Sequence, residues 1–578
     1  MTTSTTVGHE ASEHHPTVDR EGPVDDLHGR AAYRLVDDLD RFITWLPVVL
    51  GRLGTPVGEI HAYDRTTTPL RRILTRATTL GFIGALAIAA GSSLPNSPFT
   101  WKTCRGLPTG VVCHPWFFGI PAAPVVNGAP LPPDWTLFIG IVAVYGGMVL
   151  FMQAWVVLIR EARRHPGIPV RRFVPIFGAW VAPLLVVAPL FSRDAYSYAA
   201  QGEMMSRGIS PYLFGPGMIG VNSFSGLVDG LWANVTSPYG PVFLWLAGVN
   251  ATLVHHSELG SVVGFRVLAL AGVVMIAVFL PRLARAYGRD GSLAFVLGVL
   301  NPLVLLHLVA GAHNDALMLG FLVAGLAVAR ERRPVLGIVL CTIGAMIKIP
   351  GFIGVVYIGW AWLGDAAPRP ARLRPLVVAC LASLAGMAAV SEMVGLGWGW
   401  VRALSNPGNV RSWLDPATAL SQWTADLIRL LGLGDHSHPM LTGARDVGML
   451  IAAVIAARLL WTSNGEGAIR AIGLTFLAIV LLGPAVQPWY VAWAMVLLAA
   501  VAEGRTRTML IVVSIVASFL VLPGAVALVK QFGEANPYLL ALASVALLAL
   551  LAAPLLARLR RHLPAPDASE PRTEAVQP

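Results

Sequence analysis

Charged and polar residues follow directly on an apolar run in the segment FSRDAYSYAAQGEMMSRGISPY, residues 191–212. Asp194 opens a stretch that predicts a short helix, and the helical repeat puts Asp194, Tyr198 and Gln201 on one face. A carboxylate in this position can serve as a general base for a water-soluble alcohol. It can also cap the helix, a role worth about 1 kcal/mol, and the local sequence alone favours the cap.

Other polar side chains stand where apolar runs end farther along the chain. Each has an ordinary structural role open to it: the cations can snorkel toward water, the His-Asn-Asp triplet can cap a helix, and the glutamine can satisfy a backbone broken by proline. The tyrosine of the rigid turn TSPYGP offers an aromatic face and a hydroxyl, which also suit a sugar ring. The set comprises Tyr239, Arg266, His313, Asn314, Asp315, Lys348, Gln487 and Tyr490.

The composition decides where such a site can lie. The chain of 578 residues is 55% hydrophobic and only 13% charged, with a mean hydropathy of +0.65. A soluble protein of this length cannot bury so much apolar surface, so the composition predicts a chain that crosses the lipid bilayer many times. The net charge of +10 reflects arginines clustered between apolar runs. Such clusters signal membrane topology, and we expect no nucleic-acid partner.

Apolar runs of spanning length recur from residue 76 to residue 557. A transmembrane helix needs roughly 20 such residues, so the sequence predicts an all-α polytopic bundle of about fourteen transmembrane helices. The expected spans are 76–94, 135–159, 173–190, 260–281, 291–310, 316–330, 335–349, 351–364, 375–394, 446–462, 468–486, 489–503, 508–524 and 537–557.

Arginine placement orients these spans, because arginine is costly to translocate. Clusters such as Arg160, Arg163 and Arg164 mark the cytoplasmic side of the plasma membrane, and both termini then lie inside. The polar residues singled out above all face the other leaflet, and this convergence favours an extracytoplasmic site. Residues 241–256 are expected to form a helix in the outer interface, anchored by Trp245, because a span there would place RLARAYGR outside.

The same orientation divides the chain into domains. Cys104 and Cys113 fall on the oxidising side of the membrane, where a local disulfide can form, whereas Cys341 and Cys380 fall within spans and are expected to be free thiols. We expect a cytoplasmic tail at 1–70, a membrane domain at 71–557 and a disordered cytoplasmic tail at 558–578, with external segments at 95–134, 191–259 and 395–445.

Four segments together resemble a known family: FSRDAYSYAAQGEMMSRGISPY, TSPYGPVFLW, RLARAYG and NPLVLLHLVAGAHNDALMLGF. Their order and spacing are similar to those of the MptB-like polyprenol-phosphomannose-dependent α-1,6-mannosyltransferases of actinobacterial lipomannan and lipoarabinomannan assembly, which belong to the GT-C superfamily. The resemblance covers most of the membrane region but neither the tails nor residues 395–445. It implies a GT-C-type bundle, a polyprenyl-phosphate-mannose donor and a growing mannan or lipoglycan acceptor.

The resemblance also implies that the acid opening the first large external loop is catalytic, and here that acid is Asp194. A β-linked donor that gives an α-linked product requires inversion, so one general base suffices. The departing phosphate needs cations, for which the candidates are Arg193, Arg266, His313 and Lys348. The candidates for substrate binding are Tyr198, Gln201, Tyr239, Asn314, Asp315, Gln487 and Tyr490.

We expect neither a metal ion nor a cofactor. Many GT-C enzymes show two neighbouring acids, whereas Ala195 follows Asp194 here, and a single donor phosphate diminishes the need for a divalent ion. The chain has no Walker-type loop and no HExxH motif. An arabinose-bearing donor remains an alternative to mannose. A transporter or flippase, and a non-catalytic scaffold, are further alternatives, although the deep spans carry almost no charge and no repeat is present.

Overall fold

The computed structural model describes part of the chain, all of it within one compact unit that spans residues 69–578. The predicted tails, most of the first external segment with Cys104 and Cys113, and the predicted last span at 537–557 lie outside the described residues. The described residues are 70–94, 134–220, 223–409, 415–432, 434, 437–465, 467–522 and 526–527.

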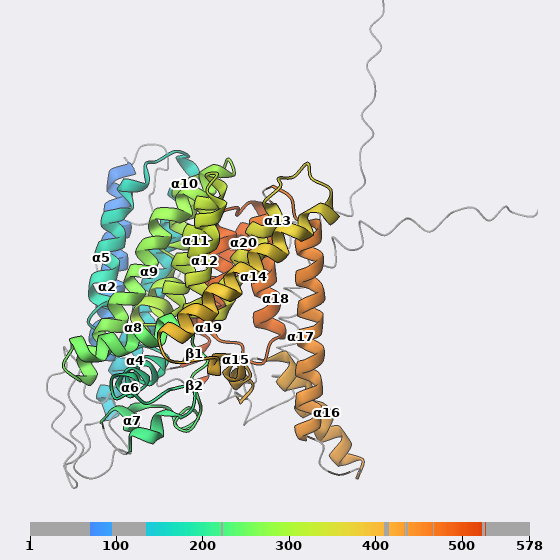
Figure 1. The fold of residues 1–578 in the computed structure, drawn as a ribbon. Coiled ribbons are helices and arrows are strands. Elements are labelled where there is room, and N and C mark those ends of the chain that lie inside the picture. Colours follow the sequence, from blue (N-terminus) through green and yellow to red (C-terminus); the bar gives the residue numbers. More distant parts are fainter. Residues whose placement is uncertain are drawn as a thin grey trace, which may run out of the picture. The chain divides into compact units, whose positions relative to one another are not determined.

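The described part of the chain is almost entirely helical, as the sequence predicts (Figure 1). Its first half consists of α2 (Leu70–Ser92), α4 (Asp134–Arg164), η1 (Val170–Arg172), α5 (Val174–Leu184), α6 (Asp194–Ser206), η2 (Pro216–Ile219), α7 (Ser223–Leu227), α8 (Pro241–Leu253), α9 (Glu258–Ala286), α10 (Gly291–Gly298) and the π-helix η3 (Val304–Ala310).

The second half continues in the same manner and ends in two residue pairs that form a short antiparallel ladder. It consists of α11 (Asp315–Arg330), α12 (Pro334–Ile347), η4 (Ile349–Gly351), α13 (Phe352–Ala361), α14 (Arg369–Met393), α15 (Gly399–Ala403), η5 (Asn406–Asn409), α16 (Pro416–Leu430), α17 (Ser437–Thr462), α18 (Gly467–Leu482), α19 (Pro488–Ala499), α20 (Gly504–Phe519), β1 (Val521–Leu522) and β2 (Val526–Ala527).

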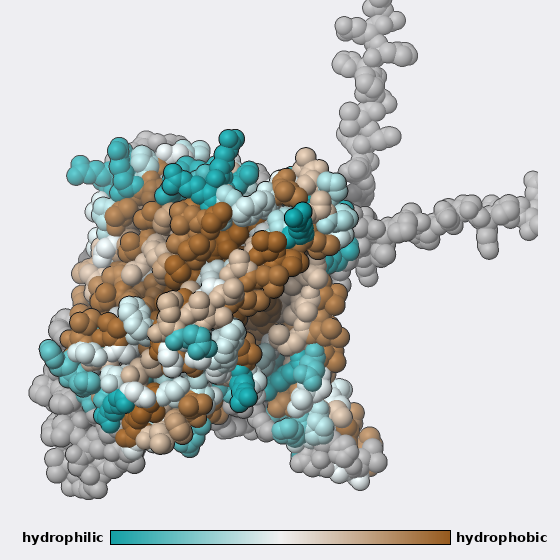
Figure 2. Space-filling model, in the orientation of Figure 1, coloured by the Kyte–Doolittle hydropathy of each residue, from teal (hydrophilic) through white to brown (hydrophobic). Residues whose placement is uncertain are grey.

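Five of the described helices are long and apolar enough to cross a membrane: α2, most of α4, α9, α14 and α17. The bent pair η3 and α11 makes a sixth if it is counted as one span, and several shorter apolar helices accompany them. Figure 2 shows a broad apolar band between two more polar zones on the face in view. The chain is therefore an all-α polytopic membrane protein. The count of about fourteen spans stays a prediction.

The run at 173–190 is not one helix, contrary to the prediction. Helix α5 ends at Leu184 after only 11 residues, and the rest of the run is irregular. A non-helical backbone inside an apolar protein needs other partners for its carbonyl groups. Arg266 of α9 supplies them, because its guanidinium donates to the carbonyl oxygens of Leu185 (2.9 Å) and Val187 (2.6 Å).

The run at 291–310 is also broken. Helix α10 ends at Gly298, Pro302 follows, and the chain resumes as the π-helix η3. Asn301 bridges the break, since its side chain donates to the Leu297 carbonyl and accepts from the Leu303 N–H. The π-helix and α11 then meet at an angle of 116°. Asp315, the first residue of α11 after this bend, is fully buried.

Helices α6, α7 and α8 gather at one end of the long helices (Figure 1). Helix α6 packs closely on α8, where Gly202 has no room for a side chain because the Ala247 carbonyl lies against it. Helix α8 confirms the expected helix within 241–256, with Trp245 half-exposed. Cys341 and Cys380 are free thiols, as predicted.

Candidate active site

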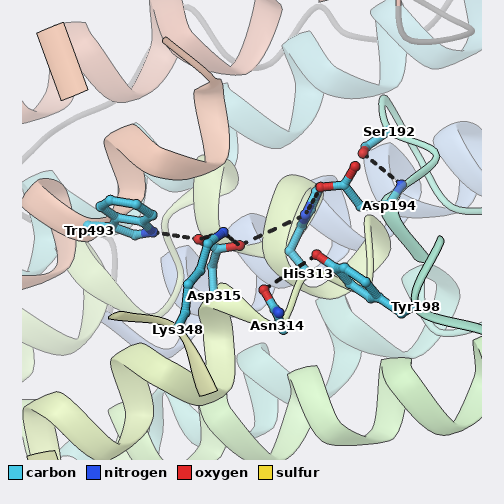
Figure 3. A network of polar contacts seen from close by, with 8 residues as sticks. All are labelled: Ser192, Asp194, Tyr198, His313, Asn314, Asp315, Lys348 and Trp493. Atoms are coloured by element: carbon cyan, nitrogen blue, oxygen red, sulfur yellow. Dashed lines mark hydrogen bonds and ion pairs between the residues drawn. The ribbon is translucent and has the colours of Figure 1, made fainter. Parts of the chain in front are cut away.

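Asp194 is the first residue of α6, and its carboxylate does not cap the helix. The Ser192 hydroxyl accepts the Asp194 N–H at 3.1 Å, and the N-cap residue Arg193 makes no side-chain cap hydrogen bond. The carboxylate instead faces the turn between η3 and α11, with Oδ2 3.5 Å from Nδ1 of His313 (Figure 3). The side chain keeps 19% of its surface exposed. The acid is therefore available for chemistry.

Burial raises the pKa of the Asp194 carboxyl to about 6. The cation of Lys348 opposes this shift, and the anion of Asp315 adds to it. At neutral pH the carboxyl is mostly ionised, yet its affinity for a proton is higher than that of an ordinary aspartate. These are the properties that a general base needs.

A second acid, Asp315, lies deeper and is fully buried at the start of α11. Both of its oxygens accept from Nζ of Lys348, at 2.8 and 2.9 Å, and Oδ1 also accepts from Nε1 of Trp493 at 2.7 Å. The ammonium lies 4.5 Å from the ring centroid of Tyr490 and 5.8 Å from that of Tyr239. Lys348 and Asp315 thus form a buried pair enclosed by aromatic rings.

His313 lies between the two acids. Its ring stacks on Trp489, with centroids 4.2 Å apart, and its Nδ1 is 4.0 Å from Oδ2 of Asp315. Among the described residues, neither ring nitrogen of His313 has a hydrogen-bond partner, and the same holds for Nδ2 of Asn314 and Nε1 of Trp489. Buried polar groups are normally satisfied by protein or water, so these four atoms can still form hydrogen bonds with a ligand or with water.

Aromatic rings build the wall beside Asp194. Tyr198 makes edge contacts with Tyr239, Phe243 and Phe265, and its hydroxyl lies 3.4 Å from Oδ1 of Asn314. Burial raises the pKa of the Tyr198 and Tyr239 hydroxyls well above their usual value, so both stay protonated. The Tyr198 hydroxyl already donates to Asn314, so the partly exposed Tyr239 hydroxyl is the one free to donate a hydrogen bond to a ligand.

Three of the predicted site residues lie in positions that support the fold: Gln201, Gln487 and Arg266. Gln201 accepts a hydrogen bond from the Ser237 hydroxyl at 3.0 Å and so fastens the turn before α8 to α6. Gln487 is the N-cap of α19 and makes no side-chain cap hydrogen bond. Arg266 is buried, and its guanidinium also donates to the Ala310 carbonyl at 2.8 Å. Its contacts give it a structural role, and phosphate binding by Arg266 stays a prediction.

Sequence reasoning missed Trp489 and Trp493, which complete the site from α19. A signal was present in QPWYVAW, because the two tryptophans are four residues apart at the start of an apolar run. An indole N–H needs a hydrogen-bond acceptor, and acyl chains offer none. Two tryptophans in this pattern therefore favour positions that face the protein interior. Among the described residues, no group of three or more His, Cys, Asp or Glu side chains is placed to hold a metal ion.

Comparison with known proteins identifies the family of the chain. Residues 119–364 match the model of the alpha-(1->6)-mannopyranosyltransferase N-terminal domain, and residues 417–553 match that of the MptB C-terminal domain. The alpha-(1->6)-mannopyranosyltransferase B of Corynebacterium glutamicum is 30% identical over an alignment of 530 positions, which covers 85% of this chain and 88% of that protein.

Two proteins of Mycobacterium tuberculosis are also similar. One alpha-(1->6)-mannopyranosyltransferase is 32% identical over 61% of this chain and 69% of its own length. The alpha-(1->6)-mannopyranosyltransferase A is 34% identical over 56% of this chain and 64% of its own length. No solved structure matches the chain. From the two family models and the long match to the Corynebacterium enzyme, we conclude that this chain is a glycosyltransferase and belongs to the alpha-(1->6)-mannopyranosyltransferase family.

Proposed function

We propose that this enzyme transfers mannose from polyprenyl-phosphate mannose to a growing α-1,6-mannan, the core of lipomannan or lipoarabinomannan, with inversion at the anomeric carbon. The reaction takes place on the extracytoplasmic face of the plasma membrane. One observation above all supports the proposal: Asp194 combines a pKa of about 6 with partial exposure, at the same end of the helices as the unpartnered donors.

In the proposed reaction the 6-hydroxyl of the acceptor mannose attacks the anomeric carbon of the donor. Its proton passes to Asp194 as the new carbon–oxygen bond forms, and the bond from the anomeric carbon to the phosphate oxygen breaks. Polyprenyl phosphate leaves with the electron pair. The ionised Asp194 is regenerated by loss of the proton to water, which its exposed edge permits.

Charge develops on the leaving phosphate, and it requires cations or hydrogen-bond donors. Arg193 precedes the base in sequence and is half-buried at the N-cap of α6, and we propose that its guanidinium turns toward the phosphate when the donor binds. Lys348 is already paired with Asp315, so we propose that it stabilises the phosphate mainly through its positive charge at a distance and not by direct contact. His313 lies between this pair and the base. A monoester phosphate served in this way needs no metal ion, and we propose that transfer is independent of metal.

The sugar is proposed to lie against the aromatic wall. Tyr239 and Tyr490 flank the ammonium of Lys348, and aromatic faces suit the apolar faces of a pyranose ring. Asn314 and Trp489 offer unpartnered N–H groups to its hydroxyl oxygens or to the phosphate. Gln201, Asp315 and Gln487 are proposed to border this sugar-binding surface and to complete substrate binding.

The proposal is tested with the purified full-length protein, radiolabelled polyprenyl-phosphate mannose and a short α-1,6-mannan. We expect mannose to be added with α configuration, with no loss of rate in EDTA. Parallel reactions with polyprenyl-phosphate arabinose measure the choice of donor. Arabinose transfer at an equal or higher rate would contradict the proposal that mannose is the donor sugar. Movement of intact lipid from one leaflet of a vesicle to the other, without sugar transfer, would favour a flippase.

A tryptophan substitution tests the unpartnered donors. Trp489→Phe keeps a ring against His313 and removes the indole N–H, so we expect the transfer rate to fall about tenfold, the effect of one lost hydrogen bond. Trp489 is buried, so the smaller ring leaves a cavity, and we expect a modest loss of thermal stability that the control below should match.

Trp360→Phe is the matched control for that experiment. Trp360 of α13 is equally buried, and its Nε1 also lacks a partner within the described structure, but its ring packs against Trp461 instead of the site. The control should keep the parental rate. Equal rates for the two variants would show that the Trp489 N–H does not contact the substrate.

A further inference from the structure

Helix α16 has its apolar and polar faces reversed relative to a helix of a soluble protein. The face that packs against α17 carries small or hydroxyl side chains, namely Ala417, Thr418, Ser421 and Ala425. The outward stripe carries large apolar side chains at helical spacing. These are Leu420 (53% exposed), Trp423 (47%), Leu427 (45%), Leu430 (78%) and, just beyond the helix, Leu431 (65%).

A charged edge separates the two faces of α16. Asp426 and Arg429 form an ion pair of 3.2 Å, and both side chains are at least a third exposed. The helix therefore presents small residues to the protein, large apolar residues on the far side, and charges along one edge. A helix that lies in the plane of a membrane surface needs this three-sided pattern, because it contacts protein, acyl chains and water at once.

Buried polar contacts fasten the start of α16 to a membrane helix. Asp415 caps α16 and is fully buried, and its carboxylate accepts from the Ala417 N–H at 3.0 Å and the Thr418 hydroxyl at 2.5 Å. Nε of Arg445, in α17, lies 3.6 Å from the same carboxylate. The orientation of α16 about its own axis is thereby set.

The same contacts place α16 at the end of the bundle that carries the site. Arg445 also donates to the Pro484 carbonyl at 3.2 Å, in the turn that leads to Gln487 and α19. Helix α17 is itself a candidate span with exposed apolar side chains, among them Leu450 and Val454. The stripe of α16 thus continues a surface that faces lipid.

We propose that α16 lies in the bilayer surface at the end of the helices where Asp194 is found. Its stripe of Leu420, Trp423, Leu427 and Leu430 enters the boundary between headgroups and acyl chains, and the edge with Asp426 and Arg429 faces the headgroups and water. The partner is the lipid leaflet, for which a tryptophan among leucines beside a charged edge is the expected composition.

The test places nitroxide labels along α16 of the full-length protein in phosphatidylcholine and phosphatidylglycerol vesicles. The labels replace single side chains through Leu427→Cys, Leu430→Cys, Asp426→Cys and Arg429→Cys, in a background from which the four natural cysteines have been removed. Variants are accepted only if they unfold at the parental temperature. The measurement is the accessibility of each label to oxygen, which concentrates in acyl chains, and to a water-soluble nickel complex.

We expect labels at 427 and 430 to be accessible mainly to oxygen, and labels at 426 and 429 to be accessible mainly to nickel. A difference of severalfold in the ratio between the two edges supports the proposal. Equal nickel accessibility at all four positions would overturn it in favour of a helix in water. Immobile labels at 427 and 430, accessible to neither reagent, would overturn it in favour of a protein partner, such as a second copy or another segment of this chain.

Discussion

Replacing Asp194 with asparagine is expected to lower the rate of mannosyl transfer by about 10²–10⁴-fold. The amide keeps the size of the side chain but cannot accept the proton of the acceptor hydroxyl. Because an ionised carboxylate is no longer buried, the variant should be at least as stable as the parent at pH 7. Transfer is measured in membranes with polyprenyl-phosphate mannose, and expression and thermal unfolding are measured on the same preparation.

The pH dependence belongs to the same prediction. The pKa of Asp194 is about 6 in the folded protein, above the usual value of an aspartate, so the parental rate should fall as the pH drops through about 6. The free energy of unfolding depends on pH in the opposite direction to the rate. The folded state holds a proton that the unfolded state has released, so this group stabilises the fold at low pH, and the effect is lost as the pH rises through about 6.

Asp229→Asn is the matched control for Asp194→Asn. Asp229 lies close enough to Asp194 for its charge to raise the pKa of that carboxyl, and its own carboxylate accepts the Leu231 N–H. The control should retain the parental rate within about twofold. Substantial transfer by Asp194→Asn at normal expression would remove Asp194 as the base and leave the family assignment intact.

Replacing Lys348 with methionine is expected to lower the free energy of unfolding by about 3–5 kcal/mol, because it leaves a buried carboxylate without its cation. Asp315 has no exposed surface, and Trp493 would be its remaining hydrogen-bond donor among the contacts described. Transfer should be lost as well, since the pair lies beside His313 and the base. Thermal unfolding in detergent and transfer in membranes are the two measurements.

The double variant Lys348→Met with Asp315→Asn separates charge from packing. It removes both charges of the buried pair, and the amide oxygen introduced in place of the carboxylate can still accept the indole N–H of Trp493. We expect it to recover most of the lost stability but not the transfer rate. A single Lys348→Met variant as stable as the parent would contradict the prediction that the fold depends on the contact between Lys348 and Asp315.

Local patterns predicted helix α6 well. Asp194 does open it, and its end near Ser206 agrees with the stop signal of Gly208, whose φ is +73°. The helix expected within 241–256 is likewise present as α8. Capping signals, glycine conformations and apolar periodicity depend on neighbours in sequence, so they can be read without the fold.

Apolar runs predicted the membrane character of the chain but not the course of every span. The runs at 173–190 and 291–310 read as spans, yet both are interrupted. The first interruption is satisfied by Arg266, which is 81 residues from Leu185. Whether a backbone can leave the helix inside a membrane depends on such distant partners, and a local pattern does not contain them.

The sequence by itself determined that this is a helical membrane protein, that Asp194 stands at the end of an apolar run, and which other polar residues stand at the ends of such runs. Only the tertiary structure decided how they pair: Asp315 binds Lys348, 33 residues away, and Trp493, 178 residues away. It also showed that Trp489 stacks on His313. The hydrophobicity of a segment can be read from that segment alone. Which buried charges and hydrogen-bond donors pair depends on which helices pack against one another, and only the tertiary structure shows this.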